Sequence, residues 1–204
     1  MGNPADSAEP LVTLHVYAPP LAAVATVSAS GARGRAHLAV IGGGFCAADL
    51  AVLLARRGAL AALDLTVIDP GRAVGRGVAY EAHADALLNV PAARMSMIPE
   101  EPGHFLAWAR RRDPAVAAED FLPRALYGAY IEETLAREAG GAVGVVKRRA
   151  MDVAQTESGW EVALEGGGRV AADAVVLATG NPPPAYPAGL PPELRADPRY
   201  IADP

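Results

Sequence analysis

The sequence predicts an α/β fold with a central parallel sheet, a small antiparallel β element and a helical cap. Strands are expected at 37–42, 64–69, 143–148 and 174–179, and the first and last of these are apolar runs typical of a buried strand. A glycine turn and a helical pattern connect the first two strands, as the crossover between parallel strands requires. The stretch 150–171 alternates in strand fashion and contains turn signals, so it predicts the antiparallel element.

The composition is that of a globular protein. Of 204 residues, 51% are apolar and 20% are charged, which excludes a disordered chain. The net charge of −5 gives no basic field for nucleic acid. A single cysteine and four scattered histidines predict no disulfide and no metal site. Residues 11–30 contain prolines and lack a basic flank, so we expect neither a membrane span nor a signal peptide, and a cytoplasmic protein.

Composition divides the chain into three zones. Residues 1–36 are rich in Ala, Pro and Ser without a sustained period, which predicts a low-complexity, disordered leader. Residues 37–184 carry the structured signals and predict one nucleotide-binding domain. Residues 185–204 are proline-rich and are interpreted as a linker or a truncated connection.

The first strand is followed by the most informative motif. The run HLAVIG at 37–42 leads into GGGF at 42–45, and the next residues, up to Gly58, show helical spacing. The following strand ends at Asp69. Strand, glycine turn, helix, strand and acid in this order form the dinucleotide fingerprint G-x-G-x-x-G/A, here Gly42, Gly44 and Ala47.

Each position of this fingerprint has a physical reason. Gly42 permits a tight turn, Gly44 lets a pyrophosphate approach the backbone, and Ala47 lets the helix lie close to the strand. The helix N-terminus offers N–H groups and a partial positive charge to phosphates. Asp69 would accept hydrogen bonds from ribose hydroxyls. The alternative is a glycine-rich turn that binds no ligand.

The remaining motifs are specific as an ordered series. The series consists of AVIGGGF at 39–45, GRGVAY at 75–80, LLNVPAARMS at 87–96, FLPRALYGAYI at 121–131 and VVLATGNPPP at 175–184. Helices are expected at 102–112 and 124–138, and they would form the cap. In this order, the sequence resembles the FAD/NAD(P)-binding flavoproteins with two dinucleotide-binding domains. Within that group it is most similar to the FAD-binding half of proteins like flavin-dependent urate hydroxylase and aspartate N-monooxygenase.

The resemblance implies a Rossmann-like FAD-binding domain and a set of cofactor-binding residues. The ADP half of FAD would lie on the glycine turn, and the end of the last strand would close over the cofactor. The loops 75–80 and 89–96 would face the flavin ring, and 150–153 would run near the adenine. The implied residues are Gly42, Gly43, Gly44, Phe45, Asp69, Arg76, Gly77, Asn89, Thr179 and Gly180. No catalytic side chain is assigned.

The resemblance also implies an activity. NAD(P)H would reduce FAD, and the protein would act on a small molecule, as a monooxygenase. The chain contains no second GxGxxG, so it is expected to be a fragment, or to have a separately encoded C-terminal half that binds NAD(P)H. Two alternatives stay open: a non-enzymatic nucleotide-binding module, and a plain NAD-dependent dehydrogenase.

The cysteine and the two tryptophans are expected to pack within the protein rather than to contact a ligand. Cys46, in the first turn of the phosphate-binding helix, is expected to be a small buried packing residue rather than a redox thiol, because it has no partner cysteine. Trp108 and Trp160 are expected in the core or on a strand face.

Overall fold

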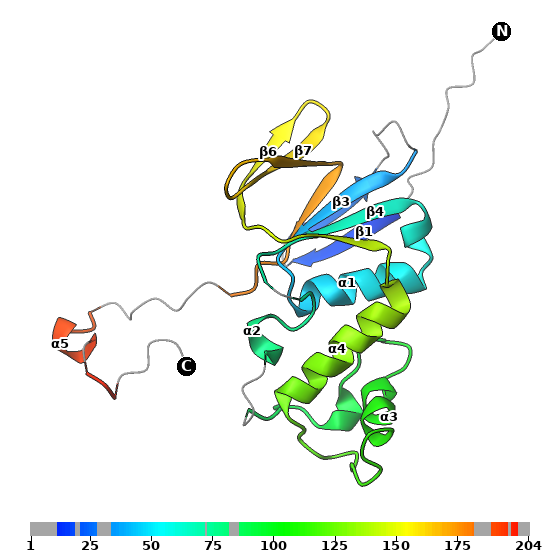
Figure 1. Cartoon of the computed structure of the whole chain (residues 1–204), viewed down its shortest axis with the longest axis vertical. Helices are drawn as coiled ribbons and strands as arrows, with labels where there is room; N and C mark the ends of the chain where they lie inside the picture. The colour runs from blue at the N-terminus through cyan, green and yellow to red at the C-terminus, as the bar shows by residue number, and fades with distance from the viewer. Residues whose placement is uncertain are drawn as a thin grey trace.

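The computed structural model describes residues 34–71, 73–81, 86–181, 189–195 and 197–199, and the backbone of 12–18 and 21–27. Its central part has three layers: helices, a parallel sheet and a smaller antiparallel sheet (Figure 1). The predicted fold class is confirmed. Figure 1 shows α1 and α4 below the parallel sheet and β6 and β7 above it.

The parallel sheet has four strands in the order β5–β4–β3–β9. Their bounds are Ala36–Ile41 for β3, Leu63–Ile68 for β4, Val143–Val146 for β5 and Ala174–Leu177 for β9. All four expected strands are present, each ending one or two residues before the predicted position. The chain runs from β3 through β4 to β5 and then returns to the other side of β3. This reversal places a topological switch point between β3 and β9, where ligands of such sheets bind.

The side chains of β3 point alternately toward the two outer layers. Leu38 and Val40 of β3 pack with residues of α1, Phe45–Arg56. Ala39 and Ile41 instead pack with Val162 and Ala172 of the antiparallel sheet. Because successive side chains of a strand point to opposite faces, the apolar run 37–42 is buried on both sides.

The antiparallel sheet consists of three consecutive strands. They are β6 Ala150–Thr156, β7 Gly159–Leu164 and β8 Arg169–Ala172. The expected element at 150–171 is confirmed, with a register shift between Ala150 and Asp152.

The helices form a layer and a cap. Helix α4, Arg124–Ala139, packs along α1. Its Ala139 lies in the sheet core, whereas Tyr127 and Ile131 lie in a second core beneath α1. Helix α3, His104–Arg110, belongs to that second core. Shorter elements are η1 Ala59–Ala61, α2 Gly77–Tyr80, η2 Ala92–Arg94 and α5 Pro192–Arg195.

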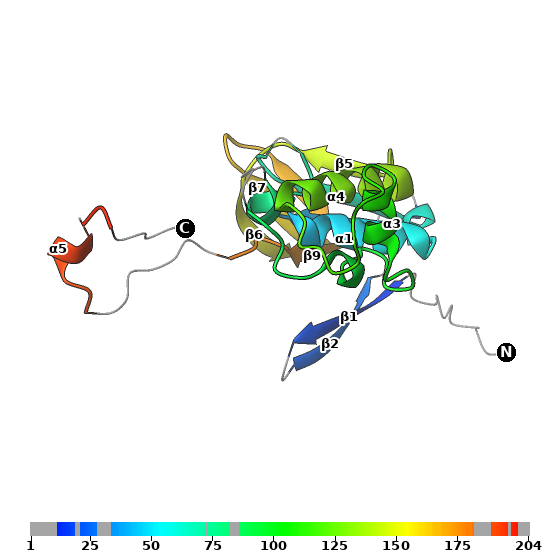
Figure 2. The same cartoon turned by 90° about the horizontal axis from the view of Figure 1, so that it is seen from below.

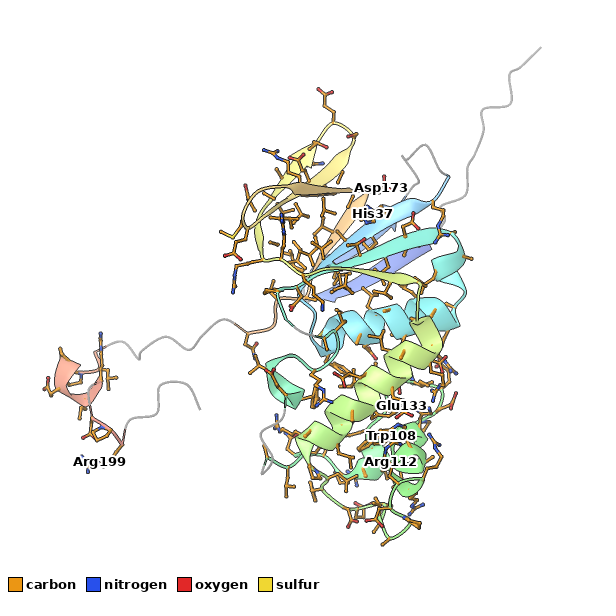
Figure 3. The ribbon with its side chains drawn as sticks, in the orientation of Figure 1. His37, Trp108, Arg112, Glu133, Asp173 and Arg199 are labelled. Carbon is orange, nitrogen blue, oxygen red and sulfur yellow. The ribbon has the colours of Figure 1, made fainter. Side chains whose placement is uncertain are left out.

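Trp108 anchors α3 to α4. Its ring is fully buried, as predicted, and its Nε1–H donates to a carboxylate oxygen of Glu133 at 2.7 Å. The guanidinium of Arg112 lies 3.7 Å from the centre of the same ring and pairs with Glu133 at 2.5 Å (Figure 3). Trp160, on β7, is partly buried.

The interval interpreted as a leader contains two strands that the sequence pattern did not predict. β1, Val12–Ala18, pairs antiparallel with β2, Leu21–Val27, and Figure 2 shows this hairpin projecting from the layers. Residues 1–11 and half of residues 185–204 lie outside the described residues, so the disordered leader and the linker stay predictions. No helix in the described ranges is long and apolar enough to cross a membrane.

Candidate functional site

The glycine turn lies at the switch point of the parallel sheet. Gly42 follows β3 with φ of 104°, a conformation that favours glycine. A Cβ at this position would overlap the carbonyl oxygen of Ala178 and lie 3.2 Å from Cα of Thr179. The N–H of Ala178 donates to the carbonyl oxygen of Ile41 at 2.8 Å. The turn after β3 and the segment after β9 are therefore in direct contact.

Helix α1 begins at this turn with unpaired donors. Gly44 is its N-cap and supplies no side chain, and the N–H groups of Ala47 and Ala48 donate to its carbonyl oxygen at 3.2 and 3.3 Å. Within the described ranges, the N–H groups of Gly44, Phe45 and Cys46 have no acceptor. Free N–H groups and the helix dipole together attract an anion such as a phosphate.

A second glycine loop closes onto this turn. The N–H of Gly75 donates to the carbonyl oxygen of Gly43 at 2.7 Å. A Cβ at Gly77 would lie 3.0 Å from Cα of Gly44, so the two backbones are packed closely. The guanidinium of Arg76 pairs with Glu132 of α4 at 2.7 Å. The structure thus brings Gly77 to the turn and directs the Arg76 side chain to α4.

Asp69 follows β4 and bridges two loops. Its Oδ2 accepts the N–H of Gly43 at 2.7 Å, and its Oδ1 accepts the N–H of Gly71 at 2.6 Å. Its own N–H donates to the carbonyl oxygen of Val146 at 3.0 Å. The residue predicted to accept ribose hydroxyls therefore already accepts a backbone N–H at each carboxylate oxygen.

A cavity of about 220 Å³ opens beside Asp69. Its walls include Gly71, Val74, Leu135, Val145 and Lys147. The sequence pattern did not single out Lys147, although it is the only lysine of the chain and directly follows β5. Because the carboxyl ends of parallel strands share one edge, residues after β5 could have been placed beside those after β4.

The remaining predicted residues occupy different positions. Thr179 and Gly180 are exposed and follow β9, and Gly180 has φ of 69°. The ring of Phe45 packs against the rings of Tyr80 and Tyr127, at centroid distances of 5.9 and 6.3 Å. The backbone of Phe45, rather than its ring, is therefore available to a ligand at the helix start.

The segment that contains Asn89 leads into the helical cap. The Asn89 side chain is exposed and makes no hydrogen bond to another described residue. The hydroxyl of Ser96 accepts the N–H of Ile98 at 2.9 Å and lies 2.8 Å from the carbonyl oxygen of Glu101. The segment 89–96 thus leads into the turn that precedes α3.

The prediction that Cys46 is buried was wrong, because Cys46 is exposed. Ala47 and Ala48, the next two residues of α1, are both fully buried and occupy the inward positions of this turn. A helix turns by about 100° per residue, so the residue before them faces outward.

A titratable residue in α1 also escaped the sequence analysis. Asp49 is half-buried, and burial raises the pKa of its carboxyl to about 6. Only its position within an apolar helix could have indicated this shift. No group of three His, Cys, Asp or Glu side chains in the described ranges could hold a metal ion.

Comparison with solved structures supports the fold. A lysine monooxygenase from Nocardia farcinica is 14% identical, with a TM-score of 0.51 over 72% of this chain and 55% of its own. A flavin monooxygenase from Stenotrophomonas maltophilia is 22% identical, with a TM-score of 0.51 over 70% of this chain and 38% of its own. A closed form of cyclohexanone monooxygenase is 17% identical, with a TM-score of 0.51 over 77% of this chain and 28% of its own.

This chain therefore spans between 28% and 55% of the length of these three proteins. The comparison with curated sequences gives no match. The family model described as FAD-NAD(P)-binding matches residues 39–182, which include the glycine turn, Asp69 and the segment after β9. The chain belongs to the FAD-NAD(P)-binding family.

Proposed function

We propose that this chain is the FAD-binding part of an NAD(P)H-dependent flavin oxidoreductase, a monooxygenase that acts on a small molecule. The observation that carries the proposal is the glycine turn at the switch point between β3 and β9, where α1 begins with unpaired N–H groups. A dinucleotide binds at this place in open α/β sheets, with its pyrophosphate at the helix N-terminus.

The residues of the turn fit the diphosphate of FAD. A Cβ at Gly44 would lie 3.8 Å from Cα of Gly77, its nearest non-local atom, so a side chain larger than a methyl group at this position would crowd the second glycine loop. The N–H groups of Gly44, Phe45 and Cys46 would donate to phosphate oxygens, and Thr179 and Gly180 would border the cofactor from β9. Bound FAD supplies the redox chemistry, and the chain's residues bind and orient it.

The monooxygenase activity and the use of NAD(P)H are the finer parts of this proposal. They are supported by the family match and by the three monooxygenases of similar fold. NAD(P)H would bind to a second nucleotide-binding domain in a separately encoded C-terminal half. The loop 75–80 and the segment 89–96 would face the flavin ring.

A second candidate is a non-enzymatic nucleotide-binding module. The glycine turn and the N–H groups at the start of α1 would bind a nucleotide in this case too. The two candidates share FAD binding and differ in whether reducing equivalents from NAD(P)H reach the flavin.

Binding of FAD to the purified 204-residue chain tests the proposal. We expect quenching of FAD fluorescence and a bound-flavin absorption spectrum. Gly44→Val places a side chain where the diphosphate would lie and should weaken binding at least about 10-fold, the loss of one charge-assisted hydrogen bond. Gly58→Ala, at the far end of α1 in open space, is the control and should bind FAD normally.

A folded chain that ignores FAD would refute the proposal. If FAD binds, NADPH oxidation is measured with and without the neighbouring gene product. Oxidation only with that product supports the oxidoreductase, and no oxidation in either case supports the module.

A further inference from the structure

Asp49 is a half-buried carboxyl in the second turn of α1. Among the described residues it forms no hydrogen bond and no ion pair. Burial raises the pKa of this carboxyl to about 6, because a desolvated charge without a partner is unfavourable. Asp49 therefore changes its charge just below neutral pH, where the charge of an ordinary aspartate is constant.

The titratable groups around Asp49 stay neutral in this pH range. Tyr127 of α4 is close enough for the charge of Asp49 to act on it: burial, two neighbouring tyrosines and the Asp49 carboxylate raise the pKa of the Tyr127 hydroxyl. Tyr80, on α2, packs against Tyr127 with 5.0 Å between the ring centroids, and burial raises the pKa of the Tyr80 hydroxyl as well. The thiol of Cys46, one turn earlier on α1, is exposed. None of these groups supplies a positive charge.

The arginines of the surrounding elements do not neutralise Asp49 either. Three of them are paired with other groups: Arg56 with Glu101 and Glu138, Arg76 with Glu132, and Arg124 with the carbonyl oxygens of Leu87 and Ala79. The carboxyl of Asp49 is therefore free to respond to a charge that a ligand brings to α1.

The anion-binding end of the same helix lies close to Asp49. Asp49 follows the N-cap Gly44 by five residues, which is about 7.5 Å along the helix axis. The N–H groups of Gly44, Phe45 and Cys46 have no acceptor in the described ranges. A diphosphate held by these N–H groups would place two negative charges at a distance over which charges still interact in a partly buried site. Because like charges disfavour an ionised carboxylate, the bound anion and the ionised Asp49 would destabilise each other.

Resting on the proposed function, we infer that binding of the anionic dinucleotide is coupled to uptake of a proton by Asp49. The chain binds FAD more tightly when Asp49 is protonated, and bound FAD makes Asp49 keep its proton to higher pH. Thermodynamic linkage requires both effects to have the same size. The diphosphate of FAD has no terminal phosphate group, so its own charge is constant over this pH range. The pH dependence is therefore a property of the protein.

Titration of the full chain with FAD at several pH values tests the coupling. The affinity should fall about 10-fold between about pH 5 and pH 8, as like charges at this spacing predict for a site of intermediate dielectric constant. Calorimetry near pH 6.5, in two buffers with different ionisation enthalpies, should show an uptake of about half a proton per FAD. FAD binding without proton uptake would overturn the inference.

Asp49→Asn assigns the proton to this residue. The amide has nearly the same shape and does not titrate, so the variant should bind FAD equally well at both ends of the pH range and take up no proton. Its affinity should match that of the unmutated chain at the acidic end. Asp49→Asn with the proton uptake of the unmutated chain would show that another group titrates and would overturn the inference.

Glu119→Gln is the matched control. Glu119 is an exposed carboxylate of the helical half and has no hydrogen bond or ion pair in the described part of the chain. This variant should keep both the pH dependence and the proton uptake of the unmutated chain. Loss of the uptake in Glu119→Gln as well would contradict a specific role of Asp49.

The outcomes separate this inference from the proposed function. FAD binding with an affinity that does not change with pH overturns only the coupling to Asp49. A folded chain that binds no FAD at any pH refutes the proposed function as well. The proton count on the unmutated chain remains a test even if Asp49→Asn does not fold.

Discussion

The sheet half and the helical half of this protein are stabilised differently. The sheet core consists of aliphatic side chains such as Leu38, Val40 and Val67, and strand pairing sets their positions. The helical core is built from the rings of Phe105, Trp108, Tyr127 and Tyr130. The difference shows that pairing between strand backbones sets the structure of the half that carries the glycine turn. In the other half, the structure is set by side-chain contacts between residues that are distant in the sequence.

Helices α1 and α4 join the two halves. Ala47 and Ala51 of α1 face the sheet core, whereas Ala48 and Val52 face the helical core. The position of the start of α1 therefore depends on packing in both cores. Substitutions in each half and changes of pH test this difference.

Phe105→Ala tests whether the two halves unfold together. Phe105 is fully buried and contacts the rings of Trp108, Tyr127 and Tyr130, so its loss should lower the free energy of unfolding by about 3–5 kcal/mol. Because α1 is shared, urea unfolding should remain a single transition. The fluorescence of Trp108 and of Trp160, each observed in a variant that lacks the other, reports on the two halves. Two separate midpoints would show that the halves are independent.

Gly42→Ala tests how the sheet half depends on the conformation of the glycine turn. The positive φ and the overlap with the carbonyl oxygen of Ala178 should together cost about 3 kcal/mol and abolish FAD binding. Gly58→Ala is the matched control, since Gly58 has φ of 70° but no atom nearby, and it should cost about 1 kcal/mol. Similar losses in the two variants would contradict the importance of the contact with Ala178.

Tyr130→Phe removes the polar link of the helical core. The hydroxyl oxygen of Tyr130 accepts the N–H of Met97 at 3.1 Å and lies 2.7 Å from Nδ1 of His104. The loss of the shared acceptor should cost about 1–3 kcal/mol in urea unfolding. Tyr80→Phe is the control, because the hydroxyl of Tyr80 has no hydrogen bond within the described ranges, and it should change stability little. Equal effects would mean that the ring, not the hydroxyl, stabilises this core.

His104, in the helical half, should make the protein less stable as the pH falls below neutrality. The guanidinium of Arg137 lies 3.0 Å from Nε2 of His104, and since arginine only donates, Nδ1 carries the proton and donates to Tyr130. Burial, together with Arg137, lowers the pKa of His104. The unfolded chain therefore binds the proton first, and this group's contribution falls as the pH drops below about 6.5.

Asp49 should act in the opposite direction. Burial raises the pKa of its carboxyl to about 6, so the folded protein takes up this proton before the unfolded chain, and the penalty disappears as the pH falls. Unfolding is measured from pH 7 to 5 in His104→Gln and Asp49→Asn. His104→Gln should flatten the loss of stability at low pH, and Asp49→Asn should stabilise the protein at pH 7. If His104→Gln steepened the loss of stability at low pH, or if Asp49→Asn destabilised the protein at pH 7, the effect of burial on these two side chains would be contradicted.

The sequence predicted the sheet half because its determinants are local. The apolar runs of β3 and β4, the glycine turn and Gly58 at the end of α1 follow from periodicity and backbone conformation within about 30 residues. The burial of Trp108 was also predicted, from its residue type.

The same reasoning failed where an outcome depends on distant contacts. Cys46 was predicted to be buried, but whether it faces inward depends on how α1 rotates against the sheet and α4. The cavity combines residues that follow β4 and β5 with Leu135 of α4, and the ion pair of Arg76 with Glu132 joins positions 56 residues apart. No local pattern specifies such pairs.

Local sequence patterns specify the α/β class, the order of the strands along the chain and the fingerprint Gly42-x-Gly44-x-x-Ala47, because backbone propensity and burial period are properties of neighbouring residues. The hydrogen bonds of Asp69 with Gly43 and Gly71, and the position of Lys147 beside the same cavity, follow instead from the folded structure. The physical reason is that hydrogen-bond partners are chosen by proximity in space, and the folding of β3, β4 and β5 into one sheet creates that proximity.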